Sequence, residues 1–166
     1  MGVEFQDFSI KVTEAMEESL IAGLYEAAGE LEARTKRNSR QGHTYGDIQA
    51  TALWDHRVDE GSMEAHVGSQ YEAAYWEEFG TGEHALHGDG RKGWWVYVEG
   101  QDSGSGGKSY ASREEAEEAA LFLRRVAKLD AYATNGTEPN EPLRRAFASA
   151  QSVVQAIFED KLKGLG

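Results

Sequence analysis

Two histidines and a glutamate lie close together in a glycine-rich loop, and these residue types could bind zinc. Glu83, His84 and His87 fall within the stretch GEHALHGDG, and His56 and His66 are further imidazoles that could join them. Zinc is held by several such ligands at once. The spacing does not favour a site, because helical zinc motifs place two histidines one turn apart around a glutamate, and no third ligand is specified here. We therefore expect no metal site.

Other arrangements that could support catalysis are also incomplete. Glu77 and Glu78 could act as general acid and base, but neighbouring residues of a helix point to different sides and do not share a site. Serine, histidine and aspartate are present without a G-x-S-x-G nucleophile motif. The segment GDGRKG lacks the spacing and the following serine or threonine of a phosphate-binding P-loop. We expect no catalytic residues and no cofactor, and we expect most of the acids to be solvated.

The chain is acidic and has the length of a single domain. Its 166 residues include 29 acids and 17 bases, for a formal net charge of −12. That charge repels phosphate backbones, so non-specific binding to nucleic acid is disfavoured. The absence of cysteine excludes disulfides and thiolate ligands. No segment is apolar over the ~20 residues of a membrane span, and no export signal is visible.

Two long amphipathic helices are predicted, one toward each end of the chain. From Phe8 to about Arg37, apolar residues recur at helical spacing with charged residues between them. The second helix follows Asn140, a candidate N-cap, carries Pro142 in its first turn and ends at Gly164. The basic residues near Arg37 complement the negative end of the helix dipole, so we do not read them as a nucleic-acid site.

Short strands are predicted between these helices. Segments 48–58 and 63–69 alternate apolar and polar residues around the turn DEGS, which is typical of a hairpin. Residues 71–79 favour a short helix, and residues 80–93 favour an exposed loop. The aromatic and β-branched run WWVYV, residues 94–98, predicts a strand.

An insertion is predicted from residue 94 to residue 134. The strand at 94–98 precedes a Gly/Ser-rich loop at 99–109, a helix at 112–128 capped by Ser112 and Glu115, and a strand at 130–134. The predicted fold is α+β, one domain over residues 1–166. An antiparallel sheet packs against the long N-terminal helix and the C-terminal helix, with a β-loop-α-β insertion at about 94–134.

The paired tryptophans of the strand at 94–98 suggest a covered surface. Successive side chains of a strand point to opposite faces, so Trp94 and Trp95 cannot be buried on the same face. Unless both faces are covered, one tryptophan is exposed or is covered by a partner. Large exposed aromatic side chains favour an interface.

Three stretches resemble one known family. VGSQYEAAYWEEFGTGEH, residues 67–84, resembles the E-F-G-T-G signature of the tail-completion proteins of long-tailed bacteriophages. TYGDI, residues 44–48, is similar to a turn that follows the first helix of that family. YATNGTEPNEPLRRAF, residues 132–147, is similar to its closing T-x-G-x-x-P-x-x-P-L motif. The residues that carry the motif are Tyr75, Glu78, Phe79, Gly80, Thr81, Gly82, Pro139, Pro142 and Leu143.

The E-F-G-T-G segment is then expected to be a structural corner. Gly80 and Gly82 permit backbone conformations that other residues avoid, and Thr81 can hydrogen-bond within the turn. We expect Phe79 to anchor the corner in the core. The loop beyond it, with its glycines and charges, is expected to reach a neighbouring subunit.

The resemblance implies a structural role in the virion. Members of the family join the head connector to the tail, so the chain would be one subunit of a ring of six copies at the head–tail junction, assembled in the host cytoplasm. Its partners would be the head connector or stopper protein and the tail terminator or tail tube protein, and DNA would pass through the ring without specific binding. The resemblance implies no membrane association. The residues expected at the subunit interface are Glu83, His84, His87, Asp89, Arg91, Lys92, Trp94 and Trp95.

Two alternatives remain open. The insertion, which is longer than in minimal members of the family, also resembles the strand-helix-strand pattern of small peptidoglycan-binding repeats. The chain would then be a non-catalytic binding module for a cell-envelope partner, with Tyr97, Tyr110 and Tyr132 as contact residues. The other alternative is a metal-dependent hydrolase that uses His84 and His87.

Overall fold

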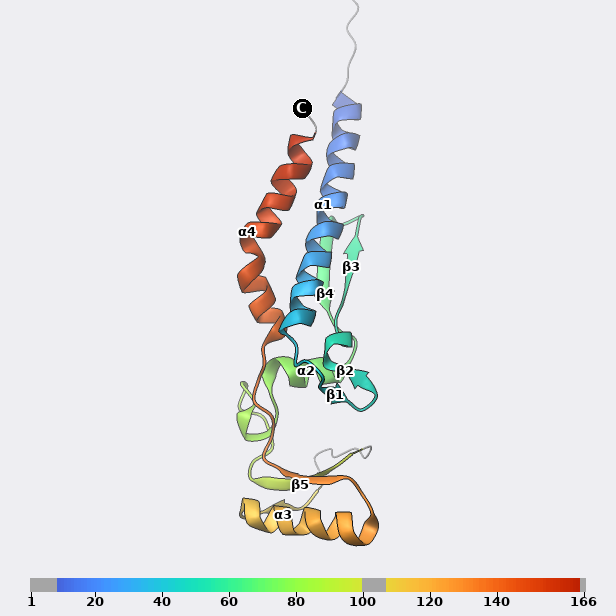
Figure 1. Cartoon of the computed structure of the whole chain (residues 1–166). Coiled ribbons are helices and arrows are strands. Elements are labelled where there is room, and N and C mark those ends of the chain that lie inside the picture. Colours follow the sequence, from blue (N-terminus) through green and yellow to red (C-terminus); the bar gives the residue numbers. More distant parts are fainter. Residues whose placement is uncertain (1–8, 100–106, 165–166) are drawn as a thin grey trace, which may run out of the picture.

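The computed structural model describes residues 9–99 and 107–164 and has the expected α+β fold. Figure 1 shows an elongated molecule with two long helices at one end, a small sheet with its own helix at the other, and short elements between them. The helices are α1 (Ser9–Asn38), α2 (Glu72–Phe79), α3 (Arg113–Phe122) and α4 (Pro142–Lys163), with single turns η1 (Ala50–Ala52), η2 (Gly82–His84) and η3 (Leu123–Ala127). The strands are β1 (Thr44–Tyr45), β2 (Ile48–Gln49), β3 (Asp55–Asp59), β4 (Glu64–Gly68), β5 (Trp94–Val98), β6 (Ser109–Tyr110) and β7 (Ala131–Thr134).

The two predicted amphipathic helices, α1 and α4, are present and run side by side in opposite directions (Figure 1). Small residues let them approach closely: Ala27, Ala28, Ala146 and Ala150 are all buried. At Gly23 a β-carbon would lie 2.7 Å from Cε1 of Phe158, so a larger residue there would displace the Phe158 ring. The packing between α1 and α4 therefore comes from the close approach of their backbones and not from large side chains.

The hairpin β3–β4 packs against α1, which confirms the prediction of a hairpin around DEGS. Asp59 accepts hydrogen bonds from the N–H groups of Gly61 and Ser62 and so stabilises the turn. The predicted first strand, 48–58, is wrong in its first half. Gly46, with φ of 59°, allows a tight turn that pairs Tyr45 with Ile48, so β1 and β2 form a separate small hairpin.

A compact apolar cluster in the middle of the molecule includes residues from the first half of the predicted strand 48–58. Ala50, Leu53, Trp54 and Ala74 are buried together, and Leu143 at the start of α4 packs against them. Instead of one sheet, the described residues form sheets of two, two and three strands. The predicted sheet against the N-terminal helix is therefore the two-stranded β3–β4 hairpin alone.

The insertion is a three-stranded antiparallel sheet in the order β6-β5-β7, with α3 covering one face. The buried alanines Ala116, Ala120 and Ala131 form the contact between α3 and the sheet. Ser112 is the N-cap of α3 and accepts a hydrogen bond from the N–H of Glu115, as predicted. Most of the predicted Gly/Ser loop at 99–109 lies outside the described residues.

Candidate functional site

The two segments that carry the E-F-G-T-G and T-x-G-x-x-P-x-x-P-L patterns lie side by side. The N–H of Thr81 donates to the carbonyl of Thr137 at 2.9 Å, and the N–H of Thr137 donates to Oγ1 of Thr81 at 2.9 Å. The N–H of Glu83 donates to the carbonyl of Asn135 at 2.9 Å. These bonds join α2, β7 and the approach to α4 in one corner, which we call the motif corner (residues 77–83 and 135–144).

Gly82 is required in the motif corner for two reasons. Its φ is 62°, a left-handed conformation that residues with a β-carbon seldom adopt. A β-carbon at this position would also lie 2.2 Å from the carbonyl oxygen of Asn135. Gly82 is buried against this backbone, and a β-carbon there would also lie 2.6 Å from the ring of Trp95.

Glu78 caps the first turn of α4. Its buried carboxylate accepts hydrogen bonds from the N–H groups of Leu143 at 2.8 Å and Arg144 at 3.0 Å. A carboxylate here satisfies two N–H groups that have no partner within the helix and faces the positive end of the helix dipole. The prediction that Asn140 is the N-cap is wrong, because the N-cap position is Glu141 and the capping side chain comes from α2.

Glu77 is fully buried and is the centre of a second set of bonds. Its carboxylate accepts from the N–H of Arg40 at 2.9 Å, from Nη1 of Arg40 at 2.7 Å, from the hydroxyl of Tyr45 at 2.6 Å and from Nδ2 of Asn140 at 2.6 Å. Burial by itself would raise the pKa of Glu77, but these donors outweigh it and lower the pKa. Burial and the bond to Glu77 together raise the pKa of Tyr45.

The expectation that most acids are solvated therefore fails for Glu77 and Glu78. As expected, the two side chains point to different partners: Glu77 reaches the segment after α1, β1 and the segment before α4, and Glu78 reaches α4 itself. The positions of Glu77 and Glu78 in the helical pattern of α2 indicate that both are buried. Ala74, Glu77 and Glu78 are spaced by three and four residues and are the buried residues of α2.

Phe79 anchors the loop that follows the motif corner and does not lie in the core. Its ring is partly exposed and contacts the rings of Tyr75 and His87, each with a centroid distance of 4.8 Å. The carbonyl of Phe79 accepts a hydrogen bond from the N–H of Leu86 at 3.0 Å. The prediction that Phe79 lies in the core is therefore wrong, because the buried positions beside it are those of Glu77 and Glu78.

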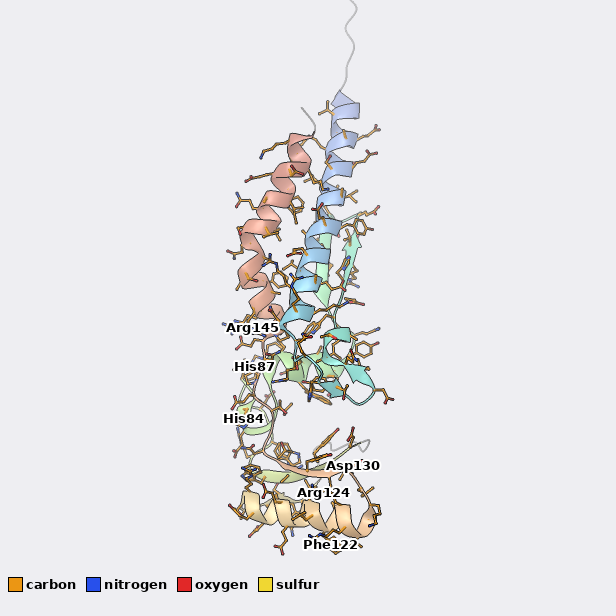
Figure 2. The ribbon with its side chains drawn as sticks, viewed as in Figure 1. His84, His87, Phe122, Arg124, Asp130 and Arg145 are labelled. Atoms are coloured by element: carbon orange, nitrogen blue, oxygen red, sulfur yellow. The ribbon has the colours of Figure 1, made fainter. Side chains whose placement is uncertain are left out.

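Six of the eight expected interface residues lie in the loop between α2 and β5, and Figure 2 labels two of them, His84 and His87. The carboxylate of Glu83 accepts from the N–H of Gly93 at 3.1 Å and from Nδ2 of Asn135 at 3.2 Å, and these bonds lower the pKa of Glu83. His84 pairs through Nδ1 with Glu138 at 2.8 Å, whereas His87 stacks on the aromatic rings. The two histidines thus have different partners.

The remaining expected interface residues differ in exposure. Asp89 and Lys92 are exposed. The guanidinium of Arg91 lies over the ring of Trp95 at 4.9 Å from its centroid, and Trp95 itself is only 9% exposed. Trp94, on the opposite face of β5, is partly buried beneath Arg113 of α3 at 5.8 Å. Both faces of β5 are therefore covered within the chain at this end, and Trp95 offers little free surface to a partner.

The side chains that the hydrolase alternative requires are dispersed. His56 pairs with Glu32 of α1, and His66 lies 3.5 Å from Glu64 on the hairpin. Among the residues that the structure describes, no three histidine, aspartate or glutamate side chains are arranged to hold a metal ion.

Of the three tyrosines of the binding-module alternative, the structure brings two together. Tyr97 and Tyr132 are directly paired across β5 and β7, and both are exposed. Tyr110 is paired with Trp94 instead and so lies on the other face of the sheet.

Comparison with protein-family models, with curated proteins and with solved structures finds no match for this chain. Within residues 9–99 and 107–164, none of the helices combines the length and the apolar character needed to cross a membrane.

Proposed function

We propose that this protein is a non-catalytic structural subunit of a bacteriophage virion, of the tail-completion type, that forms a ring between the head connector and the tail. One observation carries the proposal. The segments that resemble the family's two motifs are distant in the sequence, yet they meet in the motif corner. There Thr81 and Thr137, which are 56 residues apart, are hydrogen-bonded to each other. A resemblance carried by residues that form one structural unit is stronger than one carried by scattered matches.

The distribution of apolar side chains supports assembly with other proteins. Of the twelve buried apolar residues in the described part of the chain, nine are alanines. Fifteen large apolar residues are exposed there. Single exposed apolar residues are ordinary, but this many beside so few large buried ones is typical of a subunit whose surface is covered by partners.

The charge of the chain fits a position around passing DNA. The net charge of −12 gives a surface that does not retain a phosphate backbone, which suits a channel through which DNA slides. The basic residues Arg34 and Arg40 near the end of α1 are bonded to Glu30 and Glu77. They are thereby less available to phosphate groups.

Electron microscopy of phage lysates tests the proposal. A stop codon placed early in the gene should give filled heads separate from finished tails, and the intact protein supplied in trans should restore joined particles. A negative control is the same phage complemented with a chain ending after residue 79, which lacks most of the motif corner, the insertion and α4. Intact particles from the mutant without complementation would refute the proposed role.

A second candidate, the cell-envelope binding module, is favoured by the exposed Tyr97–Tyr132 pair. Exposed tyrosines often bind sugars or peptides through their ring faces and hydroxyls. Purified protein would be sedimented with isolated cell walls, and a Tyr97→Ala/Tyr132→Ala variant compared with Tyr71→Ala, which removes an exposed tyrosine elsewhere. Equal sedimentation of the two variants, or none for the wild type, counts against this candidate.

A further inference from the structure

The first turns of α1 carry apolar side chains that the described parts of the chain leave uncovered. Val12 and Met16 are 56% and 44% exposed. At helical spacing they continue the stripe that is buried farther along the helix at Gly23 and Ala27. Gly23 packs against Phe158, which is near the end of α4. Because α4 ends soon after, α1 projects beyond it (Figure 1).

The same turns of α1 carry more acidic than basic residues. Glu14, Glu17 and Glu18 are exposed on the same turns, and within the described ranges no ion pair involves them. The hairpin does not reach this far, since its turn meets α1 where the hydroxyl of Tyr25 donates to Glu60. Glu14 lies on the side of α1 opposite Val12 and Met16, whereas Glu17 and Glu18 lie at the two edges of this apolar stripe. We call Val12, Met16, Glu17 and Glu18 the α1 patch.

A second uncovered surface lies at the opposite end of the molecule. Phe122 and Val126 are 62% and 64% exposed, and Leu121 beside them is also exposed. Phe122 lies on the outer side of α3, away from the sheet (Figure 2). Here the helix widens into the π-helical turn η3, an uncommon feature that often accompanies functional sites.

This end of the insertion is basic, unlike most of the chain. Residues 121–130 include three bases, Arg124, Arg125 and Lys128, and one acid, Asp130. All three bases are exposed, and the guanidinium of Arg124 lies over the ring of Tyr132, at 5.9 Å from its centroid. Of the acids of α3, Glu114 and Glu115 lie in its first turn, and Glu117 and Glu118 lie in the middle of the helix. We call Leu121, Phe122, Arg125, Val126 and Lys128 the α3 patch.

We propose that the α3 patch of one copy of this chain docks on the α1 patch of a second copy. Each patch offers apolar side chains together with charges opposite in sign to those of the other, so a pairing of the two removes apolar surface from water and brings opposite charges together. The patches lie at opposite ends of the molecule (Figure 1), so the contact is heterologous and repeats from copy to copy. The inference rests on the ring in the proposed function and specifies the surfaces that build it.

Disulfide trapping tests the contact, because the natural chain has no cysteine. Met16→Cys and Phe122→Cys chains, carrying tags of different size, are mixed under mild oxidation. Docking should form the mixed disulfide about tenfold faster than when Tyr25→Cys replaces Met16→Cys, since docking raises the effective concentration of the two thiols. Tyr25 is a matched control because it is 47% exposed on the same helix. Equal rates, or a predominance of Met16→Cys homodimers, would overturn the proposal.

Charge exchange tests the electrostatic part. Arg125→Glu/Lys128→Glu in the Phe122→Cys chain should slow the mixed disulfide by roughly threefold to tenfold, as expected for two exposed ion pairs. Glu17→Lys/Glu18→Lys in the other chain should restore the rate. Reversal of Arg37 and Arg57, which are exposed elsewhere, is the control. A failure of restoration would mean that the charges do not face each other, and would contradict the proposed pairing.

The outcome is separable from that of the virion proposal. If the mixed disulfide forms but phage particles assemble without this protein, the docking surfaces are supported and the role in the virion is refuted. Phage that require the chain but show no trapping above the control would retain the role and place the contacts between copies elsewhere.

Discussion

The carboxylate of Glu77 and the guanidinium of Arg40 form an ion pair of 2.7 Å inside the protein, with no part of the Glu77 side chain exposed to solvent. The pair joins α2 to the segment after α1, while Nδ2 of Asn140 brings the approach to α4 to the same carboxylate. Three parts of the chain that are distant in sequence are thus fixed by one side chain. The position of the motif corner relative to the two long helices depends on it.

Removal of this carboxylate should destabilise the fold strongly. Glu77→Ala leaves the guanidinium of Arg40 and the amide of Asn140 without their partner, and the loss of one member of a buried pair typically costs about 3–5 kcal/mol. Urea denaturation followed by circular dichroism measures the change in the free energy of unfolding. Glu72→Ala, an exposed glutamate in the first turn of the same helix, is the control and should cost much less. Similar losses for the two variants would show that the pair contributes little.

The stability should fall in acid because of the same group. The pKa of Glu77 is lower in the folded protein than its ordinary value of 4.5, so the folded state binds its proton less readily than the unfolded state. The stabilisation is therefore complete above about pH 4.5, and it is lost as the pH falls through the folded pKa. Denaturation midpoints between neutral and acid pH measure this loss. Glu77→Gln should show a smaller loss than wild type, and an unchanged profile would contradict the assignment to Glu77.

The long periodic elements could be predicted from the sequence because their signals are local. The stripes of α1 and α4, the turn DEGS and the run WWVYV each determine an element through neighbouring residues. The strand expected at 48–58 failed at its start, because Gly46 permits a turn and Leu53 and Trp54 are used in a core cluster instead.

The polar centre of the motif corner could not be predicted in the same way. Arg40 and Asn140 lie 37 and 63 residues from Glu77, and no local pattern brings them together. The same reason explains the wrong N-cap, since Glu78 is 65 residues from Leu143. The spacing of Ala74, Glu77 and Glu78 indicated which face of α2 is buried, but it did not indicate their partners.

Two glycines with similar backbone angles should respond differently to alanine. Gly82 and Gly42 have φ of 62° and 72°, but only at Gly82 would a β-carbon collide with backbone, whereas at Gly42 nothing lies within 4 Å. Gly42→Ala should cost about 1 kcal/mol, the penalty for the left-handed conformation alone. Gly82→Ala should cost at least twice that, because the segment at Asn135 must also move. Thermal denaturation of both variants measures the difference, and equal losses would mean that the corner yields without strain.

Substitutions at Trp95 and Lys92 should separate stability from assembly. Trp95 is 9% exposed and packs beside Gly82, so Trp95→Ala should lower the free energy of unfolding by about 3–5 kcal/mol, as other buried aromatic truncations do. A defect in particle assembly with this variant would then reflect its fold. Lys92 is exposed, and Lys92→Glu should change stability by no more than about 0.5 kcal/mol. If the loop between α2 and β5 contacts a neighbouring subunit, Lys92→Glu should still fail to complement head–tail joining in the stop-codon phage. Full complementation by a normally folded Lys92→Glu chain would exclude Lys92 from the subunit interface and leave the docking of α3 on α1 as the contact to pursue.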